Sequence, residues 1–439
     1  MIEKIKVGIL TLGCKVNQYE SEAIAEALEA RGFKVMPHSA KCDAYIINTC
    51  TVTAESDRKA RQMIRRMIKS NPCAFILITG CYSQVSPDEV AKIQGVDYIC
   101  GSSNKMTVVD KLCELVQRDS KNASAEICVP DLDTSGFESM SINRFERTRA
   151  YVKIEDGCES RCAYCTIPAS RGPIRSKPFN EVIEEVKTLA DGGCREIVLT
   201  GIETGSYGKD LSEGEDLASL LCAIDRIEGV RRVRLGSLDP TVIKPSFVEK
   251  IKDLRTLAPH FHLSLQSGSS RILALMKRKY NADQAMRAIE LLRSAIPGVK
   301  FTTDIIVGFP EEREEDFNAS CEFARKAEFL MIHVFPYSKR KGTVAASMKN
   351  QVAESIKHER VARLTEISQK IRIDILDREI TSEESKEVLF ETFKDGYAYG
   401  HTSDFIEVRV KTDKDLRSLL RKVRLISHNE DYCDGILIE

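Results

Sequence analysis

Short apolar runs alternate with amphipathic or charged segments along the first part of the chain. The runs at 6–12, 44–49 and 74–79 have the length of strands. The segment at 20–31 is amphipathic and closes at a glycine, and the segment at 55–69 is long and charged, as expected of helices. Strands separated by helices indicate a parallel sheet. We therefore expect a parallel-sheet α/β domain over residues 1–143.

The same alternation continues in the middle of the chain, where six further strand-length runs have helical segments between them. About six strand–helix repeats predict an open, partial (β/α)6 barrel over residues 144–372 instead of a closed eight-stranded barrel. The site of such a barrel lies where its strands end. The expected strands are 150–155, 195–200, 231–236, 260–265, 301–307 and 331–335, with helices such as 181–189 and 282–294.

The pattern changes after a long charged helix expected at 352–380. Five short strand-like segments follow between 387 and 439, which is typical of a small β-barrel, and we expect this third unit over residues 373–439. Aromatic and basic residues alternate in it and suggest a face that binds RNA. The alternative is a structural cap whose aromatic side chains fill its core. The residues concerned are Tyr397, Tyr399, His401, Phe405 and Arg409.

Three cysteines of the second unit lie in one short loop with the spacing C-x-x-x-C-x-x-C. Cys158, Cys162 and Cys165 supply three thiolates. A 4Fe-4S cluster normally takes four thiolates, so three leave one iron open to a small molecule. A zinc loop or three unligated thiols are the alternatives. Structural zinc needs a fourth ligand, usually from a C-x-x-C pair downstream, and the chain has no such pair.

Three cysteines of the first unit each follow an expected strand by one or two residues. Cys14, Cys50 and Cys81 come directly after Gly or Thr and before a polar loop. Because parallel strands end at one edge of a sheet, these thiols should converge there. Chance is the alternative, since Cys42, Cys73, Cys100, Cys113 and Cys128 are scattered through the same unit. We interpret the three as a second three-cysteine site.

Glycine-containing or polar turns follow three strands of the second unit. Gly201 and Glu203 follow one strand, Gln266 and Ser267 another, and Val307 ends a third. A glycine lets the backbone approach a ligand closely, and a carboxylate can accept a hydrogen bond from an ammonium group. Each turn alone is compatible with ordinary turn chemistry. Their common edge favours a ligand site.

Composition indicates the cellular compartment but does not identify the class of partner. Fifteen cysteines in 439 residues are too dilute for a disulfide framework, and an odd number cannot be fully paired. Both observations indicate a reducing compartment. The N-terminus has no signal-peptide pattern, and no apolar run approaches the roughly 20 residues that span a bilayer. We expect a cytoplasmic protein without membrane association. The net charge of −1 neither favours nor excludes nucleic acid.

Two groups of basic residues are candidate contacts for phosphate or carboxylate. Arg171 and Arg175, just past the cysteine loop, could pair with a carboxylate or a phosphate, or lie in a solvated loop. The charged helix of the first unit could contact RNA backbone or simply face solvent. Its basic residues are Arg58, Lys59, Arg61, Arg65, Arg66 and Lys69.

Over its whole length the chain resembles the radical S-adenosylmethionine (SAM) methylthiotransferases. The cysteine loop, with an aromatic residue before its last cysteine, is similar to their SAM-cluster motif. Other specific stretches are Thr11-Leu-Gly-Cys-Lys-Val-Asn-Gln-Tyr-Glu-Ser, Asn48-Thr-Cys-Thr-Val-Thr, Gly80-Cys-Tyr-Ser-Gln, Leu199-Thr-Gly-Ile-Glu-Thr-Gly and His333-Val-Phe-Pro-Tyr-Ser-Lys-Arg-Lys-Gly-Thr.

Within that family the chain looks most like the branch that adds a methylthio group to C2 of N6-threonylcarbamoyladenosine at position 37 of tRNA. The branches acting on isopentenyladenosine in tRNA or on a ribosomal-protein aspartate are alternatives. A non-catalytic iron–sulfur protein that binds RNA or carries electrons is an alternative of another class. A carrier would prefer four protein thiolates per cluster.

The resemblance implies two 4Fe-4S clusters, SAM as cofactor, and a C-terminal TRAM domain that binds RNA. Cys14, Cys50 and Cys81 would hold the auxiliary cluster, and Cys158, Cys162 and Cys165 the SAM cluster. It also implies the anticodon stem-loop of tRNA as partner, a low-potential electron donor and a monomeric enzyme. The residues expected around SAM are Tyr164, Gly201, Glu203, Gln266, Ser267 and Val307.

The implied chemistry places the difficult steps on the cofactors. One electron from the SAM cluster cleaves SAM, and the resulting 5′-deoxyadenosyl radical removes a hydrogen from the adenine. The auxiliary cluster provides sulfur, and a second SAM provides the methyl group. The sequence demands no protein nucleophile or acid–base pair.

Two stretches depart from the family pattern. The chain reads Phe309-Pro-Glu-Glu-Arg313 where the family usually has Phe-Pro-Gly-Glu-Thr. A glycine that is usual in a later loop of the TRAM barrel is missing around 419–422.

Overall fold

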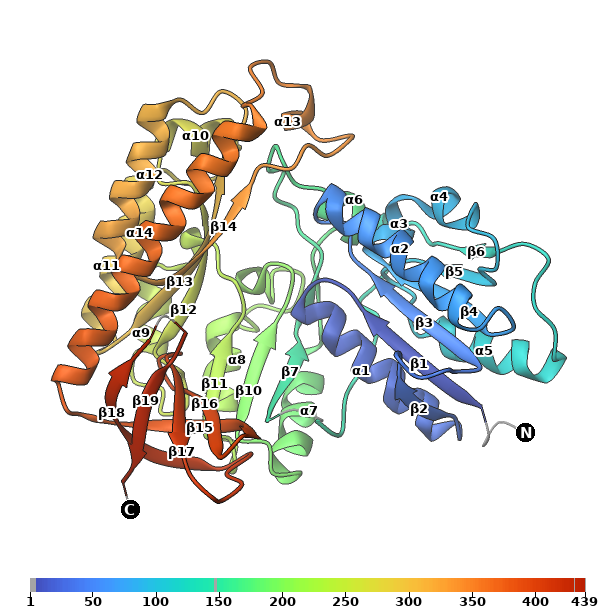
Figure 1. Cartoon of the computed structure of the whole chain (residues 1–439), viewed down its shortest axis with the longest axis horizontal. Helices are drawn as coiled ribbons and strands as arrows, with labels where there is room; N and C mark the ends of the chain where they lie inside the picture. Colours follow the sequence, from blue (N-terminus) through green and yellow to red (C-terminus); the bar gives the residue numbers. More distant parts are fainter. Residues whose placement is uncertain (1–4, 146–147, 430, 439) are drawn as a thin grey trace.

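The computed structural model describes residues 5–145, 148–429 and 431–438, and its three units lie side by side (Figure 1). The first unit is a six-stranded sheet in the order β2-β1-β3-β4-β5-β6, with every neighbouring pair parallel. The strands are β1 (Lys6–Thr11), β2 (Lys34–Pro37), β3 (Ala44–Thr49), β4 (Phe75–Gly80), β5 (Tyr98–Cys100) and β6 (Glu126–Cys128).

Helices cover both faces of this sheet. Apolar side chains of α1 (Lys15–Ala30) and α5 (Thr107–Arg118) pack on one face, and those of α2 (Ala54–Ser70) on the other. The chain therefore changes faces between β1 and β3. In open α/β sheets, ligands bind beyond the strand ends at such a switch point. The short helices α3 (Cys81–Val85) and α4 (Pro87–Ala91) follow β4.

The predicted strands of this unit are confirmed, but α1 begins at Lys15, five residues before the start expected at 20. Cys14 occupies its N-cap position with extended backbone, so the polar stretch after the cysteine already belongs to the helix. The pattern also missed β5 and β6, because each has only three residues and β6 is exposed.

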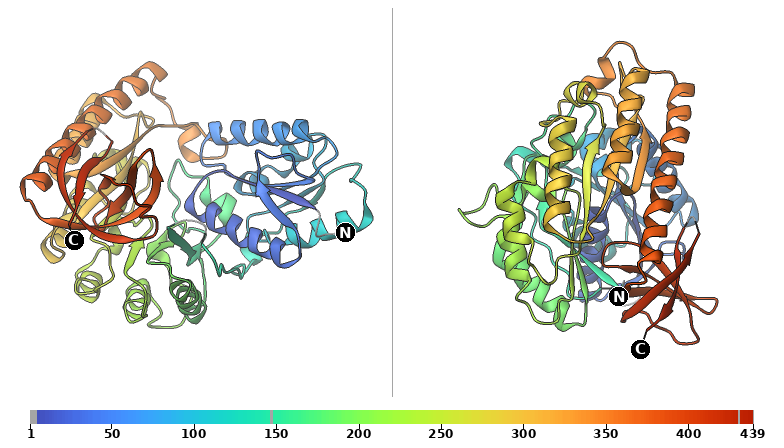
Figure 2. Two further views of the ribbon diagram at one scale, coloured as in Figure 1. Left: turned by 60° about the horizontal axis from the view of Figure 1, so that its bottom comes forward. Right: turned by 90° about the vertical axis from the view of Figure 1, so that its left-hand side faces the viewer.

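The second unit is a crescent of six parallel strands, which confirms the partial barrel. The sheets β7-β10-β11 and β12-β13-β14 join through two isolated bridges, one from Val233 of β11 to Leu257 and one from Leu238 to Leu263 of β12. Helices cover its outer face (Figure 2). The strands are β7 (Arg149–Lys153), β10 (Glu196–Thr200), β11 (Arg232–Leu235), β12 (His260–Gln266), β13 (Lys300–Val307) and β14 (Phe329–Pro336). The main helices are α7 (Phe179–Asp191), α8 (Leu217–Ile224), α9 (Pro245–Ile251), α11 (Ala282–Ala295) and α12 (Glu314–Ala327).

The third unit is a closed five-stranded barrel in the order β15-β16-β17-β19-β18, as expected. It follows α14 (Glu354–Thr381), which packs along β14, so the boundary expected at 372/373 falls inside this helix. The last expected strand ends at residue 439, which is outside the described residues. The strands are β15 (Ser385–Lys394), β16 (Tyr397–Thr402), β17 (Glu407–Lys411), β18 (Leu420–His428) and β19 (Cys433–Leu437).

The small barrel packs against the edge where the crescent strands begin, opposite the edge where they end. The ring of Phe405 stacks on that of His260, the first residue of β12, with centroids 4.5 Å apart. Arg149, the first residue of β7, pairs with Glu391, which also contacts His401 at 2.6 Å. His401 and Phe405 therefore hold the two units together and do not form an RNA-binding face, contrary to expectation.

Among the described residues, no helix combines the length and the apolar character needed to cross a bilayer.

Candidate iron–sulfur and SAM site

The three cysteines of the first unit lie at the carboxyl ends of neighbouring strands. Cys14 follows β1, Cys50 follows β3 and Cys81 begins the helix after β4. Burial and the charge of Cys81 raise the pKa of Cys50 to about 11, which places these two sulfurs within electrostatic reach. Gly13 has a φ of +102°, and a Cβ there would lie 2.7 Å from the Cβ of Cys50. The close approach of the two loops therefore requires glycine.

The cysteine loop of the second unit follows β7 and is fixed by its own backbone. The sulfurs of Cys158 and Cys165 each accept a hydrogen bond from the backbone amide two residues on, at 3.4 Å. Before the loop, Gly157 has a φ of +87°, and a Cβ there would lie 1.8 Å from the carbonyl oxygen of Pro173. This turn excludes any side chain.

The two trios are neighbours. The hydroxyl of Thr166, next to Cys165, donates a hydrogen bond to the carbonyl oxygen of Thr51, next to Cys50, at 3.4 Å. The helix that begins with Cys81 packs against α6 (Ile167–Arg171), which follows the cysteine loop. The fold therefore places both three-cysteine sites at the junction of the first two units.

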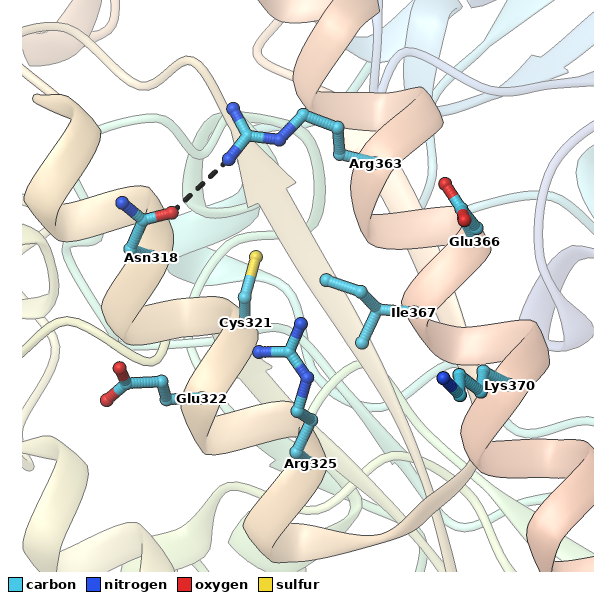
Figure 3. Close-up of a pocket in the computed structure, with 8 residues that line it drawn as sticks. All are labelled: Asn318, Cys321, Glu322, Arg325, Arg363, Glu366, Ile367 and Lys370. Atoms are coloured by element: carbon cyan, nitrogen blue, oxygen red, sulfur yellow. Dashed lines mark hydrogen bonds between the residues drawn. The ribbon is translucent and has the colours of Figure 1, made fainter.

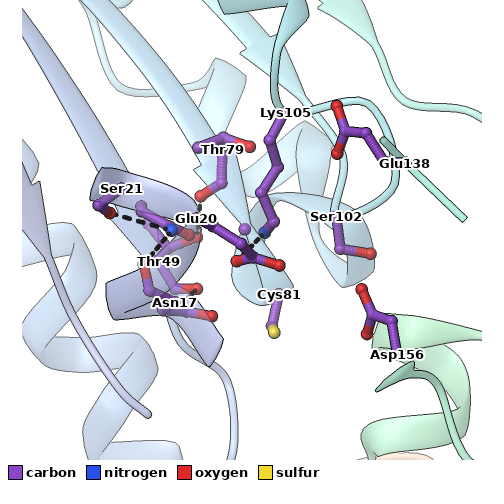
Figure 4. Close-up of polar contacts among 12 residues, drawn as sticks. Asn17, Glu20, Ser21, Thr49, Thr79, Cys81, Ser102, Lys105, Glu138 and Asp156 are labelled. Carbon is purple, nitrogen blue, oxygen red and sulfur yellow. Dashed lines mark hydrogen bonds and ion pairs between the residues drawn. The ribbon is translucent and has the colours of Figure 1, made fainter. Parts of the chain in front are cut away.

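A buried arginine joins the two sites. The Arg171 side chain is fully buried, and its Nε donates to the sulfur of Cys81 at 3.1 Å. Its Nη1 donates to Glu20 at 2.6 Å and to Asp156 at 3.0 Å, and Asp156 lies two residues before Cys158. Figure 4 shows the side chains of Glu20, Cys81 and Asp156 in the same region, with Glu20 paired to Lys105.

Two buried lysines balance the charge of this network. The Nζ atoms of Lys105 and Lys153 lie 3.1 and 2.9 Å from the carboxylate of Glu20. Burial alone would raise the pKa of Glu20, but Arg171 and the two lysines hold it well below its ordinary value. The carboxylate therefore stays ionised although it has no exposed surface, and the first two units are joined by charge as well as by packing.

Arg171 and Arg175 are buried among protein groups, so neither the ligand contact nor the solvated loop that the sequence left open describes them. The guanidinium of Arg171 is occupied by Glu20, Asp156 and Cys81. Arg175 is buried too, and it donates to the backbone carbonyl of Arg171. Burial withdraws both side chains from SAM and from tRNA.

Three residues expected around SAM lie near the cysteine loop. The backbone amide of Glu203 donates to Glu155 at 2.9 Å, and its carboxylate accepts from the amide of Asp239 at 3.1 Å. Burial and the charge of Asp239 raise the pKa of Glu203 to about 7. At Gly201 a Cβ would lie 2.7 Å from the Glu155 carboxylate, and the ring of Tyr164 meets Phe309 edge-on at 6.5 Å.

The other three lie at the ends of β12 and β13. Gln266 is partly exposed and has a φ of +71°. Ser267 is buried, with its hydroxyl 3.2 Å from that of Ser320. The side chain of Val307 is in the main core, and its carbonyl accepts from the amide of Tyr337 at 2.9 Å. Any contact of Ser267 or Val307 with a ligand would therefore come from the backbone.

One arginine beside the loop was missed at the sequence level. Nη1 of Arg278 donates to the sulfur of Cys162 at 3.4 Å, and Nη2 donates to Asp239 at 2.7 Å. The guanidinium also lies 5.1 Å from the ring centre of Tyr280. Its partner cysteine is more than a hundred positions away, so no local motif indicates this contact.

The turn that departs from the family pattern keeps a shape suited to glycine. Glu311, at the usual glycine position, has a φ of +69°, and its amide donates to the carbonyl of Asn350 at 3.0 Å. Arg313 occupies the N-cap of α12, and its amide donates to the carboxylate of Asp316 at 3.0 Å. The turn keeps its shape although Glu311 must adopt a left-handed backbone conformation, which is strained for any residue other than glycine.

A surface pocket of about 500 Å³ lies elsewhere, between α12 and α14. Figure 3 shows Cys321 between charged side chains of the two helices, with Arg363 donating to Asn318 at 3.3 Å. None of the six proposed cluster cysteines lines this pocket. It lies outside the crescent and takes no part in the site described above.

Neither trio is compact enough for a single tetrahedral zinc ion. Within the described part of the chain, neither trio has its three sulfurs all within 4.8 Å of one another. Thiolates around one tetrahedral zinc ion, with bonds of about 2.3 Å, lie only about 3.8 Å apart. Hydrogen bonds from Arg171 and Arg278 to sulfur are of the kind that tunes iron–sulfur clusters.

Comparisons with known proteins identify the family. The Radical SAM superfamily matches residues 152–324, and the uncharacterized protein family UPF0004 matches residues 6–101. Threonylcarbamoyladenosine tRNA methylthiotransferase MtaB of Bacillus subtilis is 38% identical, covering 98% of this chain and 95% of its own. MtaB of Thermotoga maritima is 39% identical, with 98% of each chain covered.

A relative of another specificity and a solved structure extend the comparison. The tRNA-2-methylthio-N(6)-dimethylallyladenosine synthase of Aquifex aeolicus is 32% identical, with 99% of each chain covered. The radical SAM methyltransferase TsrM of Kitasatospora setae shares the fold, with a TM-score of 0.57 at 14% identity over 78% of this chain and 77% of its own. The chain thus belongs to the radical-SAM methylthiotransferase family, is similar to its MtaB members, and is an enzyme that uses SAM and a 4Fe-4S cluster.

Proposed function

We propose that this enzyme adds a methylthio group to C2 of N6-threonylcarbamoyladenosine at position 37 of tRNA. The observation that carries the proposal is the contact between the two three-cysteine sites, through Thr166 and Thr51. Sulfur insertion needs a radical source and a sulfur source close together. The threonylcarbamoyl substrate is supported by relatives of that name, which are 38% and 39% identical over nearly the whole chain.

In this proposal each trio holds one 4Fe-4S cluster. Cys158, Cys162 and Cys165 would leave one iron open for SAM, and Cys14, Cys50 and Cys81 would hold the auxiliary cluster. When bound, the clusters and SAM supply the radical, the sulfur and the methyl group. The protein holds the thiolates: Arg171 and Arg278 each donate a guanidinium hydrogen bond to a cysteine sulfur.

The residues expected around SAM act in two ways. The carboxylate of Glu203 would accept a hydrogen bond from the ammonium group of SAM, and Gly201 leaves room for the Glu155 carboxylate that Glu203 contacts through its backbone amide. Gln266 would offer its side chain, whereas Ser267 and Val307 would offer backbone groups. The ring of Tyr164 would pack the loop against Phe309, and so keep water from the cluster.

The small barrel would bind the tRNA through a smaller set of aromatic residues than the sequence indicated. Tyr397, Tyr399 and Tyr432 are partly exposed, with Arg409 between two of them. The Arg409 guanidinium lies 4.7 Å from the ring centre of Tyr397 and 4.3 Å from that of Tyr432. Aromatic rings with an adjacent guanidinium suit the stacking of unpaired bases.

The domain assignments remain part of the proposal. Residues 1–143 would be the methylthiotransferase domain and the crescent the radical-SAM core. The TRAM domain would begin after α14, because that helix continues to Thr381. The low-potential electron donor, the monomeric state and the cytoplasmic location stay predictions.

Nucleoside analysis of tRNA tests the substrate. In a strain that lacks this gene we expect 2-methylthio-N6-threonylcarbamoyladenosine to disappear and its unmethylthiolated precursor to accumulate. The wild-type gene should restore it, and a gene encoding Cys162→Ala should not. Retention of this nucleoside with loss of the 2-methylthio dimethylallyl derivative would instead assign the enzyme to the other tRNA branch.

A further inference from the structure

Three polar side chains lie close together on the inner face of the crescent. His262 on β12, Asp304 on β13 and His333 on β14 have ring nitrogens and a carboxylate oxygen all within 4.8 Å of one another. Nε2 of His262 is 3.3 Å from Asp304, and Asp304 and His333 are paired in register. The alternate residues of these strands, such as Leu263 and Ile305, are buried in the main core beneath the helices. We call these three residues the polar ring.

A buried hydroxyl orients the polar ring. Oγ1 of Thr302 lies 3.0 Å from Nε2 of His260 and 2.9 Å from Nδ1 of His262. A hydroxyl donates once, so Thr302 can accept from His260 and donate to His262. In this arrangement the Nε2–H of His262 donates to Asp304. Thr302 thus fixes the ring of His262, while His333 is exposed on the same face.

A lysine of the first unit lies within electrostatic reach of the polar ring. Lys15 is the first residue of α1, whose body packs against β7 at the open side of the crescent (Figure 1). It is solvent-exposed, and its charge acts on Asp304 and on His333. Together, the polar ring and Lys15 place two imidazoles, one carboxylate and one ammonium group around a region open to solvent.

An apolar row separates the polar ring from the strand ends. Ile306 and Phe335 lie two residues beyond Asp304 and His333 on the same strands and face, and they are also paired in register. Two residues of strand span about 6.6 Å. Phe335 is 47% exposed, and Ile306 packs against the cluster that contains Ala163 of the cysteine loop. If a planar base lay between the apolar row and the cysteine loop, its substituent would be directed at the polar ring.

We propose that the polar ring and Lys15 recognise a carboxylate-bearing substituent on the adenine, while the base lies against Ile306 and Phe335; this rests on the proposed function and names its specificity determinant. Lys15 and an N–H of His333 would donate to the carboxylate of the threonylcarbamoyl group, while His262 holds Asp304 in place. Asp304 would accept from its hydroxyl or its N–H groups. A dimethylallyl chain satisfies none of these groups, and unpaired polar groups in a binding site give strong rejection.

The test compares two tRNA substrates that differ only in the substituent. Reconstituted holoenzyme would be assayed for methylthiolation of tRNA with N6-threonylcarbamoyladenosine at position 37 and of the same tRNA with unmodified adenosine there. We expect His333→Leu to lower kcat/KM for the first substrate at least tenfold and to leave kcat/KM for the second within about twofold. His358→Leu, which removes an exposed histidine of α14, is the matched control and should change neither. Iron content should match wild type in both variants.

The outcomes separate the inference from the function on which it rests. If wild-type enzyme does not act on the threonylcarbamoyl tRNA, the proposed function fails. If it does act, but His333→Leu and Asp304→Asn lower kcat/KM equally for both substrates or for neither, only the recognition by the polar ring is wrong. Stoichiometric binding of Zn²⁺ that His333→Leu abolishes, with the substrate preference unchanged, would also overturn the inference, because two histidines and a carboxylate can instead bind a metal ion.

Discussion

The two three-cysteine sites are built in opposite ways. One takes all its thiols from eight consecutive residues after a single strand, and the other collects them from the ends of three strands. The loop site depends on local backbone, above all the turn at Gly157. The distributed site depends on the parallel sheet and on the buried charges around Arg171. A local site is therefore predictable from spacing, whereas a distributed site is predictable only through the topology that brings its parts together.

Removing thiolates from one site at a time should separate the roles of the two sites, and this is the largest effect we expect. Cys162→Ala should reduce 5′-deoxyadenosine formation to background, because SAM would lose its cluster. The triple variant Cys14→Ala, Cys50→Ala, Cys81→Ala should still cleave SAM but insert no sulfur. Anaerobic reconstitution and chromatography of products measure both. Near-normal SAM cleavage by Cys162→Ala would refute the assignment.

The arginines beside the two sites should differ in how much they contribute to the free energy of unfolding. Arg171→Met leaves Glu20 and Asp156 buried with one cation fewer, and removing one partner of a buried pair costs about 3–5 kcal/mol. Arg278 pairs with Asp239 alone and is less enclosed, so Arg278→Met should cost less. Urea unfolding of the reconstituted proteins measures both. Equal losses would contradict the special dependence of the distributed site on its buried charges.

Glycine substitutions should damage one site at a time. Gly157→Ala should disturb the loop site and Gly13→Ala the distributed site, because their added Cβ atoms would lie 1.8 and 2.7 Å from neighbouring atoms. Gly298→Ala is the control, since its φ is +72° but nothing lies within 4 Å of the added Cβ. The control should lose only about 1–2 kcal/mol from strain. Loss of iron in the control, or equal damage to both clusters in either variant, would contradict this account.

The smallest effect concerns the turn next to the predicted SAM site. Glu311→Gly relieves left-handed strain of about 1–2 kcal/mol. Glycine also stabilises the unfolded chain by about 0.4–1 kcal/mol through its greater conformational entropy, so the expected net gain in the free energy of unfolding is about 0–1.6 kcal/mol. Thermal unfolding with and without SAM measures it. A clear loss of stability would show that the Glu311 side chain has a role of its own.

The sequence predicted whatever depends on local pattern or on the edge of a parallel sheet. Strand positions, the crescent, the small barrel and both cysteine trios follow from periodicity and spacing. For Arg171 the sequence left a ligand contact and a solvated loop open, and its burial could not be foreseen, because burial of a charged side chain depends on partners from other segments. Phe405 was expected to face RNA for the same reason: its neighbour His260 belongs to another unit. Contacts between units leave no periodic signal in either partner.

Iron content is the most direct test of the central claim that two separate trios hold two clusters. Wild-type protein reconstituted with iron and sulfide should hold about eight iron atoms, four per cluster. The triple alanine variant of Cys14, Cys50 and Cys81 and that of Cys158, Cys162 and Cys165 should each hold about four, with a Mössbauer spectrum of a single 4Fe-4S cluster. Loss of all iron in either variant, or full iron in either, would contradict the account.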